Sequence, residues 1–292
     1  MHEGVIIRGI AGFYYVDIGN GSIVECKARG RFRKEGLSPI VGDRVVIELV
    51  DLSHGIIDQI KPRKSQLIRP LIANIDQAIV IFALKKPDIN YTLLDKLLIQ
   101  IEHNGLDAAI CFNKADLDDE GIYERTAAIY EKIGYRVIKT KALDGEGIEK
   151  IKELLSGKIS VLTGPSGAGK STLFNQLQNK LKMATGEISK KVDRGKHTTR
   201  HAELIEVSKD TYVVDTPGFS SVDIGFIEPG ELQYAFKEFK DYIGKCKFSS
   251  CLHNKESFCR IKEEVENGSI PVERYDAYIE ILKELRENRR TR

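Results

Sequence analysis

The chain has 292 residues, of which 41% are hydrophobic and 30% are charged, and its net charge is +2. This is an ordinary globular balance, and the length indicates two or three domains. The longest apolar run, residues 78–84, is far too short to cross a bilayer, and the N-terminus lacks a signal-peptide layout. We therefore expect a cytoplasmic protein with no membrane partner, and five cysteines that serve as thiols or metal ligands rather than disulfides.

Residues 1–68 are predicted to form a small closed β-barrel of the OB-fold type. Five short apolar segments are separated by turns rich in glycine and asparagine. The expected strands cover 4–10, 13–18, 22–28, 43–50 and 55–61. OB-folds commonly bind oligonucleotides, so we expect RNA contact, although a purely structural barrel is the alternative.

Basic side chains gather in three runs along the chain. Residues 26–34 carry five lysines and arginines without an acid, residues 61–70 carry four, and the tail 286–292 adds more. The first run is expected at a strand end and loop of the barrel. Three such runs favour a polyanionic partner such as RNA.

Residues 69–224 are predicted to form an α/β domain with a mostly parallel sheet and helices on both faces. Apolar strand segments alternate with helix-period segments at 91–105, 123–134 and 147–157. The expected strands are 77–84, 107–113, 135–140, 158–164, 202–207 and 211–216. Residues 225–292 are predicted to form a helical domain, whose last helix opens at Pro271.

A guanine-reading box directly follows the apolar strand residues 107–112. It consists of Asn113, Lys114, Ala115 and Asp116. The Asp116 carboxylate can accept hydrogen bonds from guanine N1–H and the 2-amino group, whereas adenine would leave a buried carboxylate unpaired. Asn113 is expected to fix the loop, and the Lys114 stem to lie along the base. Ala142, after the next strand, is expected to offer its N–H to guanine O6.

A phosphate-binding loop lies between the strand 158–164 and a helix start. Its glycines let backbone N–H groups turn toward phosphate oxygens, and the helix N-terminus adds positive potential. Lys170 is expected to reach the β- and γ-phosphates, and Ser171 to bind Mg²⁺. The nucleotide-binding residues of this loop are Gly164, Pro165, Ser166, Gly167, Ala168, Gly169, Lys170, Ser171 and Thr172.

Two switch segments are expected downstream. Asp215, at a strand end, is placed to hold Mg²⁺ through water, and the Gly218 N–H to sense the γ-phosphate. In the polar segment 194–204, a threonine is expected to close over Mg²⁺. We favour Thr199, because a Thr followed by Arg and a strand matches the first switch of many translation-associated GTPases, and Thr198 is the alternative.

The order of these motifs is the reverse of an ordinary GTPase, in which the phosphate loop precedes the guanine box. Joining the old termini through the helix at 145–157 and opening the domain after the second switch produces the observed order. A doubly wound sheet tolerates this rearrangement where its termini lie close together. The sequence therefore predicts a circularly permuted GTPase domain.

A cluster of soft ligands lies in the last domain, with the spacing Cys-x₄-Cys-x-His-x₅-Cys. Three thiolates and one imidazole satisfy a tetrahedral structural Zn²⁺ site with no open position. The predicted ligands are Cys246, Cys251, His253 and Cys259. Free thiols or a redox pair are the alternatives, and Cys26 and Cys111 are expected to be core residues.

Together these features resemble the circularly permuted small-ribosomal-subunit biogenesis GTPases of the RsgA family, over the whole chain. The resemblance implies an N-terminal OB-fold, a permuted GTPase domain and a C-terminal zinc domain. It implies GTP/GDP with Mg²⁺ as ligands and the 30S subunit, including 16S rRNA, as the partner of a monomer. It also implies hydrolysis stimulated by that subunit late in its maturation, followed by release.

The position after Gly218, where many GTPases carry a water-orienting Gln, is Phe219. We therefore expect slow intrinsic hydrolysis. His197 is the best local substitute and resembles a histidine with a proposed catalytic role in the family, although it is equally interpretable as a loop residue. The chain passes from the second switch into the zinc domain through residues 220–236, so nucleotide state is expected to affect the subunit-binding domain. The rival functions are a metabolic P-loop enzyme and an RNA-binding module with a decayed GTPase site.

Overall fold

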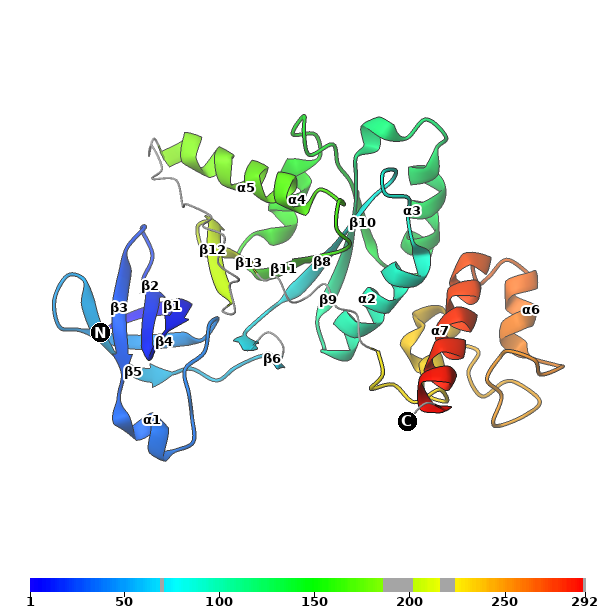
Figure 1. The fold of residues 1–292 in the computed structure, drawn as a ribbon, viewed down its shortest axis with the longest axis horizontal. Helices are drawn as coiled ribbons and strands as arrows, with labels where there is room; N and C mark the ends of the chain where they lie inside the picture. Colours follow the sequence, from blue (N-terminus) through cyan, green and yellow to red (C-terminus); the bar gives the residue numbers. More distant parts are fainter. Residues whose placement is uncertain (69–70, 186–201, 216–223, 291–292) are drawn as a thin grey trace. The chain divides into compact units, whose positions relative to one another are not determined.

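The computed structural model describes residues 1–68, 71–185, 202–215 and 224–290 (Figure 1). The chain divides into two compact units, each assembled from separate segments. The first comprises 1–79, 140–163 and 169–220, and the second comprises 80–139, 164–168 and 221–292. Among the described residues, no helix is long and apolar enough to span a membrane.

The N-terminal strands form a closed barrel in the order β1-β2-β3-β5-β4, which confirms the predicted OB-like fold. The strands are β1 (His2–Ile10), β2 (Phe13–Asp17), β3 (Ile23–Ala28), β4 (Arg44–Leu49) and β5 (His54–Ile60). Alternate residues such as Val24 and Cys26 point into an apolar interior, as the period of a strand requires. The basic segment differs from expectation, because residues after β3 form a short helix, α1 (Gly30–Lys34), which buries Phe32 in the barrel core.

The α/β part contains a six-stranded sheet in the order β10-β9-β8-β11-β13-β12. Its strands are β8 (Gln77–Ala83), β9 (Asp107–Asn113), β10 (Arg136–Lys139), β11 (Ile159–Thr163), β12 (Glu203–Ser208) and β13 (Thr211–Asp215). β9 and β10 are parallel, as are β11 and β13, whereas the edge strand β12 is antiparallel to β13. Every residue of β8 is buried, as expected for a strand covered on both faces.

Four helices accompany these strands at the predicted positions. They are α2 (Tyr91–His103), α3 (Ile122–Lys132), α4 (Ile148–Leu155) and α5 (Lys170–Thr185). α2 is capped at its N-terminus by Asn90, whose side chain accepts a hydrogen bond from the Leu93 N–H at 2.9 Å. Such a cap satisfies one of the unpaired N–H groups of the first turn.

The C-terminal residues of the second unit pack on α2. They form two 3₁₀ turns, η2 (Leu232–Ala235) and η3 (Lys237–Phe239), and two helices, α6 (Arg260–Glu266) and α7 (Val272–Arg290). α7, drawn in red, lies beside α2 (Figure 1). Lys96 of α2 forms an ion pair with Glu284 of α7, and Ile99 of α2 enters the core of the C-terminal segment.

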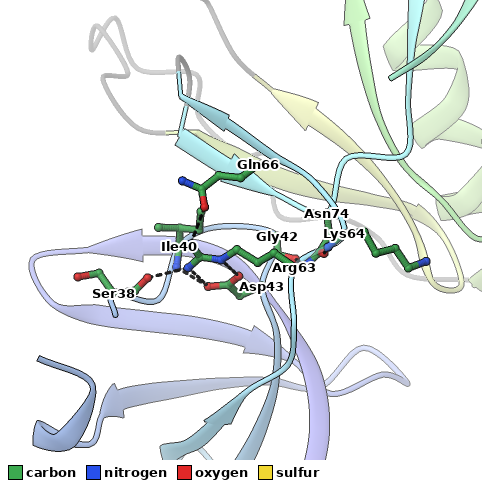
Figure 2. Close-up of polar contacts among 8 residues, drawn as sticks. All are labelled: Ser38, Ile40, Gly42, Asp43, Arg63, Lys64, Gln66 and Asn74. Carbon is green, nitrogen blue, oxygen red and sulfur yellow. Dashed lines mark hydrogen bonds and ion pairs between the residues drawn. The ribbon is translucent and has the colours of Figure 1, made fainter. Parts of the chain in front are cut away.

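A two-stranded hairpin, β6 (Gln66–Ile68) and β7 (Leu71–Ala73), follows the barrel and was not predicted from the sequence. Its join to the barrel is built around the fully buried carboxylate of Asp43 (Figure 2). Arg63 Nε and Nη2 donate to this carboxylate at 2.7 and 2.8 Å. Two further guanidinium N–H groups donate to the Ser38 carbonyl and to Gln66 Oε1.

Asn74 completes this join on the side of β7. Its Oδ1 accepts the Lys64 N–H at 2.8 Å, and its Nδ2 donates to the Gly42 carbonyl at 2.9 Å (Figure 2). Gly42 has φ +88°, and a Cβ there would collide with the Ala73 carbonyl oxygen. The loop before β4 and the strand β7 therefore meet backbone to backbone.

Candidate nucleotide site and metal centre

The guanine-reading box is presented at the carboxyl end of β9. Asn113 is the last residue of this strand, and Lys114 takes a left-handed conformation with φ 59°. This turn starts the 3₁₀ helix η1 (Ala115–Leu117), in which Ala115 is buried and Asp116 is exposed. The Asp116 carboxylate is therefore accessible to a base, as its predicted role requires.

Asn113 connects this box to the phosphate loop. Its side chain is buried, and its Nδ2 donates to the carbonyl of Ala168 at 3.0 Å. Lys114 Nζ also has a backbone partner, the Lys86 carbonyl. The two motifs, which are in reversed order and whose contacting residues are 55 positions apart, thus meet in the fold.

Gly164, the first residue of the phosphate loop, lies directly against β8. Gly164 has φ +137°, and a Cβ there would collide with the carbonyl oxygen of Ile81. Gly167 also has a positive φ, +79°, in the exposed part of the loop. Glycine is thus required at Gly164 by close packing as well as by its backbone conformation.

The rest of the predicted nucleotide site belongs to the first unit. Gly169 has φ +92°, and Lys170, Ser171 and Thr172 form the first turn of α5. Partial burial lowers the pKa of Lys170 from its ordinary value, because the charged ammonium loses hydration. Ala142 is buried in a loop. How these residues lie against Asn113 and Asp116 stays a prediction.

The predicted switch residues fall outside the described residues. His197, Thr198 and Thr199 belong to 186–201, and Gly218 belongs to 216–223. Asp215 ends β13, where its backbone pairs with Glu203, but its side chain is outside the described part. The roles assigned to these five residues therefore stay predictions.

The four predicted zinc ligands come together in the C-terminal segment. Their ligand atoms all lie within 4.8 Å of one another. His253 Nδ1 is 3.6, 3.4 and 3.3 Å from the sulfur atoms of Cys246, Cys251 and Cys259, respectively. The Cys246 and Cys259 sulfur atoms are 3.9 Å apart.

These distances fit a tetrahedral zinc ion. Bonds of about 2.3 Å to sulfur and about 2.0 Å to nitrogen imply edges of about 3.8 Å between sulfurs and about 3.5 Å between sulfur and nitrogen. Backbone N–H groups also point at the sulfurs, from Arg260 to Cys246 at 3.3 Å and from His253 to Cys251 at 3.4 Å. The donor set is therefore suited to a closed structural site.

A fifth side chain, Gln233 of η2, contacts this cluster and was missed by the sequence reasoning. Its Oε1 lies 2.9 Å from His253 Nε2, on the opposite side of the imidazole from the sulfurs. The two residues are separated by 20 positions, and Gln233 lies outside the Cys/His spacing pattern. Only folding reveals this contact.

The basic runs are partly neutralised by acids distant in sequence. Arg29 binds Glu48 and Asp58, each at 2.7 Å, and Arg31 also contacts Asp58. In the second run, Lys61 pairs with Glu3, and Arg63 pairs with buried Asp43. The first run retains three exposed cations outside these ion pairs, namely Lys27, Arg33 and Lys34.

Comparison with known proteins agrees with this geometry. A family model described as RsgA GTPase matches residues 60–225, and one described as RsgA N-terminal domain matches residues 3–57. The chain is 50% identical to the small ribosomal subunit biogenesis GTPase RsgA of Clostridium perfringens (strain ATCC 13124), over 97% of this chain and 98% of that one. It is 45% identical to the protein of the same name from Caldanaerobacter subterraneus subsp. tengcongensis, over 99% and 98% of the two chains.

Two solved structures are similar over nearly the full length. The circularly permuted GTPase YloQ has a TM-score of 0.80 at 36% identity, with coverage of 99% of this chain and 96% of that one. YjeQ from Thermotoga maritima has a TM-score of 0.80 at 37% identity, with coverage of 97% and 98%. These similarities confirm the permuted GTPase fold.

Proposed function

Because the chain belongs to the RsgA GTPase family, we propose that it hydrolyses GTP during late maturation of the small ribosomal subunit. The observation that carries this proposal is the hydrogen bond from Asn113 to Ala168, which joins the guanine box to the phosphate loop. A metabolic P-loop enzyme would need no guanine reader at this place. Competition by GTP, but not by ATP, for a labelled guanine nucleotide separates the two functions.

The nucleotide is held by the residues predicted from the sequence. Asp116 accepts hydrogen bonds from the guanine edge, Ala142 donates its N–H to O6, and the loop from Gly164 to Thr172 surrounds the phosphates. Ser171, Thr199 and Asp215 would hold Mg²⁺, which supplies charge neutralisation at the β- and γ-phosphates. Lys170 adds a positive charge there, and its partly desolvated ammonium favours a polyanionic partner.

Zinc would be held by Cys246, Cys251, His253 and Cys259, and would supply rigid cross-links within a segment that has little regular structure. Metal analysis of the purified chain is expected to give one zinc per molecule. Cys259→Ser is expected to lose zinc, whereas Cys111→Ala, outside the cluster, is expected to retain it. Equal zinc content in both variants would contradict this assignment.

The partner is the 30S subunit, including 16S rRNA, bound by a monomer in the cytoplasm. Support comes from the family and from exposed cations of the OB-like barrel such as Arg33 and Lys34. The decisive experiment is a GTPase assay with and without purified 30S subunits. Strong stimulation supports the proposal, and absent turnover with 30S subunits present would instead favour an RNA-binding module with a decayed GTPase.

Hydrolysis is proposed to depend on His197, because Phe219 cannot orient water. Binding of the subunit would bring His197 to the attacking water. His197→Ala is expected to lower 30S-stimulated turnover while leaving GTP affinity unchanged. Full stimulated turnover in this variant would show that His197 is only a loop residue.

Nucleotide state is proposed to control release. The second switch leads directly into the segment that carries the zinc ligands, so loss of the γ-phosphate can alter the subunit-binding domain. Affinity for 30S subunits is expected to be higher with a non-hydrolysable GTP analogue than with GDP. Equal co-sedimentation in the two states would contradict this coupling.

A further inference from the structure

The side chain of Gln233 has one orientation that satisfies both of its neighbours. Its Nε2 donates to the Gly230 carbonyl at 2.9 Å, and its Oε1 lies 2.9 Å from His253 Nε2. With the amide reversed, its oxygen would face the Gly230 carbonyl, and two acceptors would meet. The amide oxygen therefore faces the imidazole.

This orientation decides the tautomer of His253. An amide oxygen accepts and does not donate, so His253 Nε2 must carry the proton. The unprotonated nitrogen is then Nδ1, which lies 3.3–3.6 Å from the three cysteine sulfurs. A metal ligand must offer such a lone pair.

Packing and a backbone hydrogen bond also restrict the orientation of the imidazole. His253 is 1% exposed and has a left-handed backbone with φ 56°. The Tyr275 hydroxyl donates to its carbonyl at 2.7 Å, and Phe239 meets its ring edge to face at a centroid distance of 5.9 Å. These contacts fix the ring plane, and the Gln233 amide distinguishes one ring nitrogen from the other.

We propose that Gln233 is a positioning residue of the metal site, which keeps His253 protonated at Nε2 so that Nδ1 binds the metal. This inference rests on the zinc site proposed above. Its consequence is that η2, located between the second switch and the cysteine cluster, is tied to the metal. Gln233 thus gives the segment after the switch a direct connection to the zinc centre.

The first test is ¹⁵N-histidine NMR of the zinc-loaded full chain. A long-range ¹H–¹⁵N correlation is expected to show His253 protonated at Nε2 and metal-bound at Nδ1. The reverse pattern would overturn the proposal without affecting zinc binding itself. A zinc-free wild-type chain in metal analysis would refute the zinc site, and this proposal with it.

The second test is competition for zinc between the protein and a chromophoric chelator. Gln233→Met replaces the glutamine by a side chain of similar size that has no amide oxygen to accept the proton of His253 Nε2. It is expected to weaken zinc binding by 10- to 100-fold. Gln233→Glu keeps an acceptor oxygen toward His253 Nε2 but loses the donor to the Gly230 carbonyl, so it is expected to bind zinc more tightly than Gln233→Met and less tightly than the wild type. Gln176→Met is the matched control, because Gln176 is also half-buried and also donates to a backbone carbonyl, that of Leu143.

Wild-type zinc affinity in Gln233→Met would overturn the proposal. Equal weakening in Gln176→Met would also count against it, because the effect would then be a general consequence of losing a glutamine. If Gln233→Met fails to fold, the NMR pattern of the wild-type chain still decides.

Discussion

The guanidinium of Arg274 lies against the carboxylate of Asp95, with 2.5 Å between Nη1 and Oδ1, and both side chains are withdrawn from water. Arg274 belongs to α7 and Asp95 to α2, so the ion pair joins the C-terminal segment to helix α2 of the α/β part. Glu238 binds the same guanidinium at 2.6 Å, and Tyr130 donates to Asp95 at 2.8 Å. One buried cation thus compensates two buried acids.

Arg274→Leu is expected to destabilise the protein strongly. It leaves the carboxylates of Asp95 and Glu238 buried without a counter-charge, and breaking such a buried pair typically costs about 3–5 kcal/mol. Urea unfolding of the full chain measures the change. Arg286→Leu, at an exposed position on the same helix, is the control and is expected to change stability by less than about 1 kcal/mol.

Asp95 gives stability a specific pH dependence. Burial raises its pKa to about 6, and the attraction of Arg274 only partly opposes this effect. Between its ordinary pKa of 3.8 and about 6, the folded state binds a proton that the unfolded state has released. The contribution of Asp95 to stability therefore falls as pH rises through this window, and it is constant above it. The unfolding free energy of the wild type is measured at pH 4.5 and at pH 7, and Asp95 is expected to lower the value at pH 7 relative to pH 4.5. Asp95→Asn, which cannot titrate, is expected to lack this contribution to the difference between the two pH values.

Arg63→Met is expected to loosen the join between the barrel and the β6–β7 hairpin. The fully buried Asp43 would lose both N–H donors of the guanidinium, at a cost of about 3 kcal/mol. Arg63→Lys should restore little, because an ammonium cannot reproduce the bidentate contact. Arg33→Met, at an exposed position, is the control, and similar unfolding midpoints for Arg63→Met and Arg33→Met would contradict this role.

Asp116→Asn is expected to change base preference. The amide cannot accept both hydrogen bonds from guanine N1–H and the 2-amino group, but it can donate to the C2 oxygen of xanthine. GTP affinity should fall at least 100-fold, and xanthosine triphosphate should bind better than GTP. Asp107→Asn, at the other end of β9, is the control and should bind GTP like the wild type. Unchanged GTP affinity in Asp116→Asn would refute the guanine-reading assignment.

Gly164→Ala is expected to damage the phosphate loop. The added Cβ would meet the Ile81 carbonyl oxygen, and alanine is strained at φ +137°. Strain of this kind costs about 1–3 kcal/mol, apart from the steric collision. Calorimetry should show lower thermal stability and weaker GTP binding. Gly30→Ala, where a Cβ meets open space at ordinary φ, should leave both properties unchanged.

Local patterns in the sequence determined the strands, the helices and the motif order. The phosphate loop, the guanine box and the Cys/His cluster are each contiguous, because their chemistry requires ligand groups at close spacing along the backbone. The six strands of the α/β sheet were likewise predictable, since their apolar runs alternate with helix-period segments. The short helix α1 was missed, because five residues contain too little periodicity to identify a helix.

The tertiary structure alone decided which distant polar groups meet. Arg63 belongs to a basic run of the sequence, but in the fold its guanidinium forms an ion pair with Asp43, which is 20 residues away. The same holds for Gln233 with His253 and for Arg274 with Asp95, which are joined only when separate elements pack. Burial makes each of these pairings necessary, because a polar group removed from water must find a hydrogen-bonding or charged partner. The spacing of residues along the sequence does not indicate which residue that partner is.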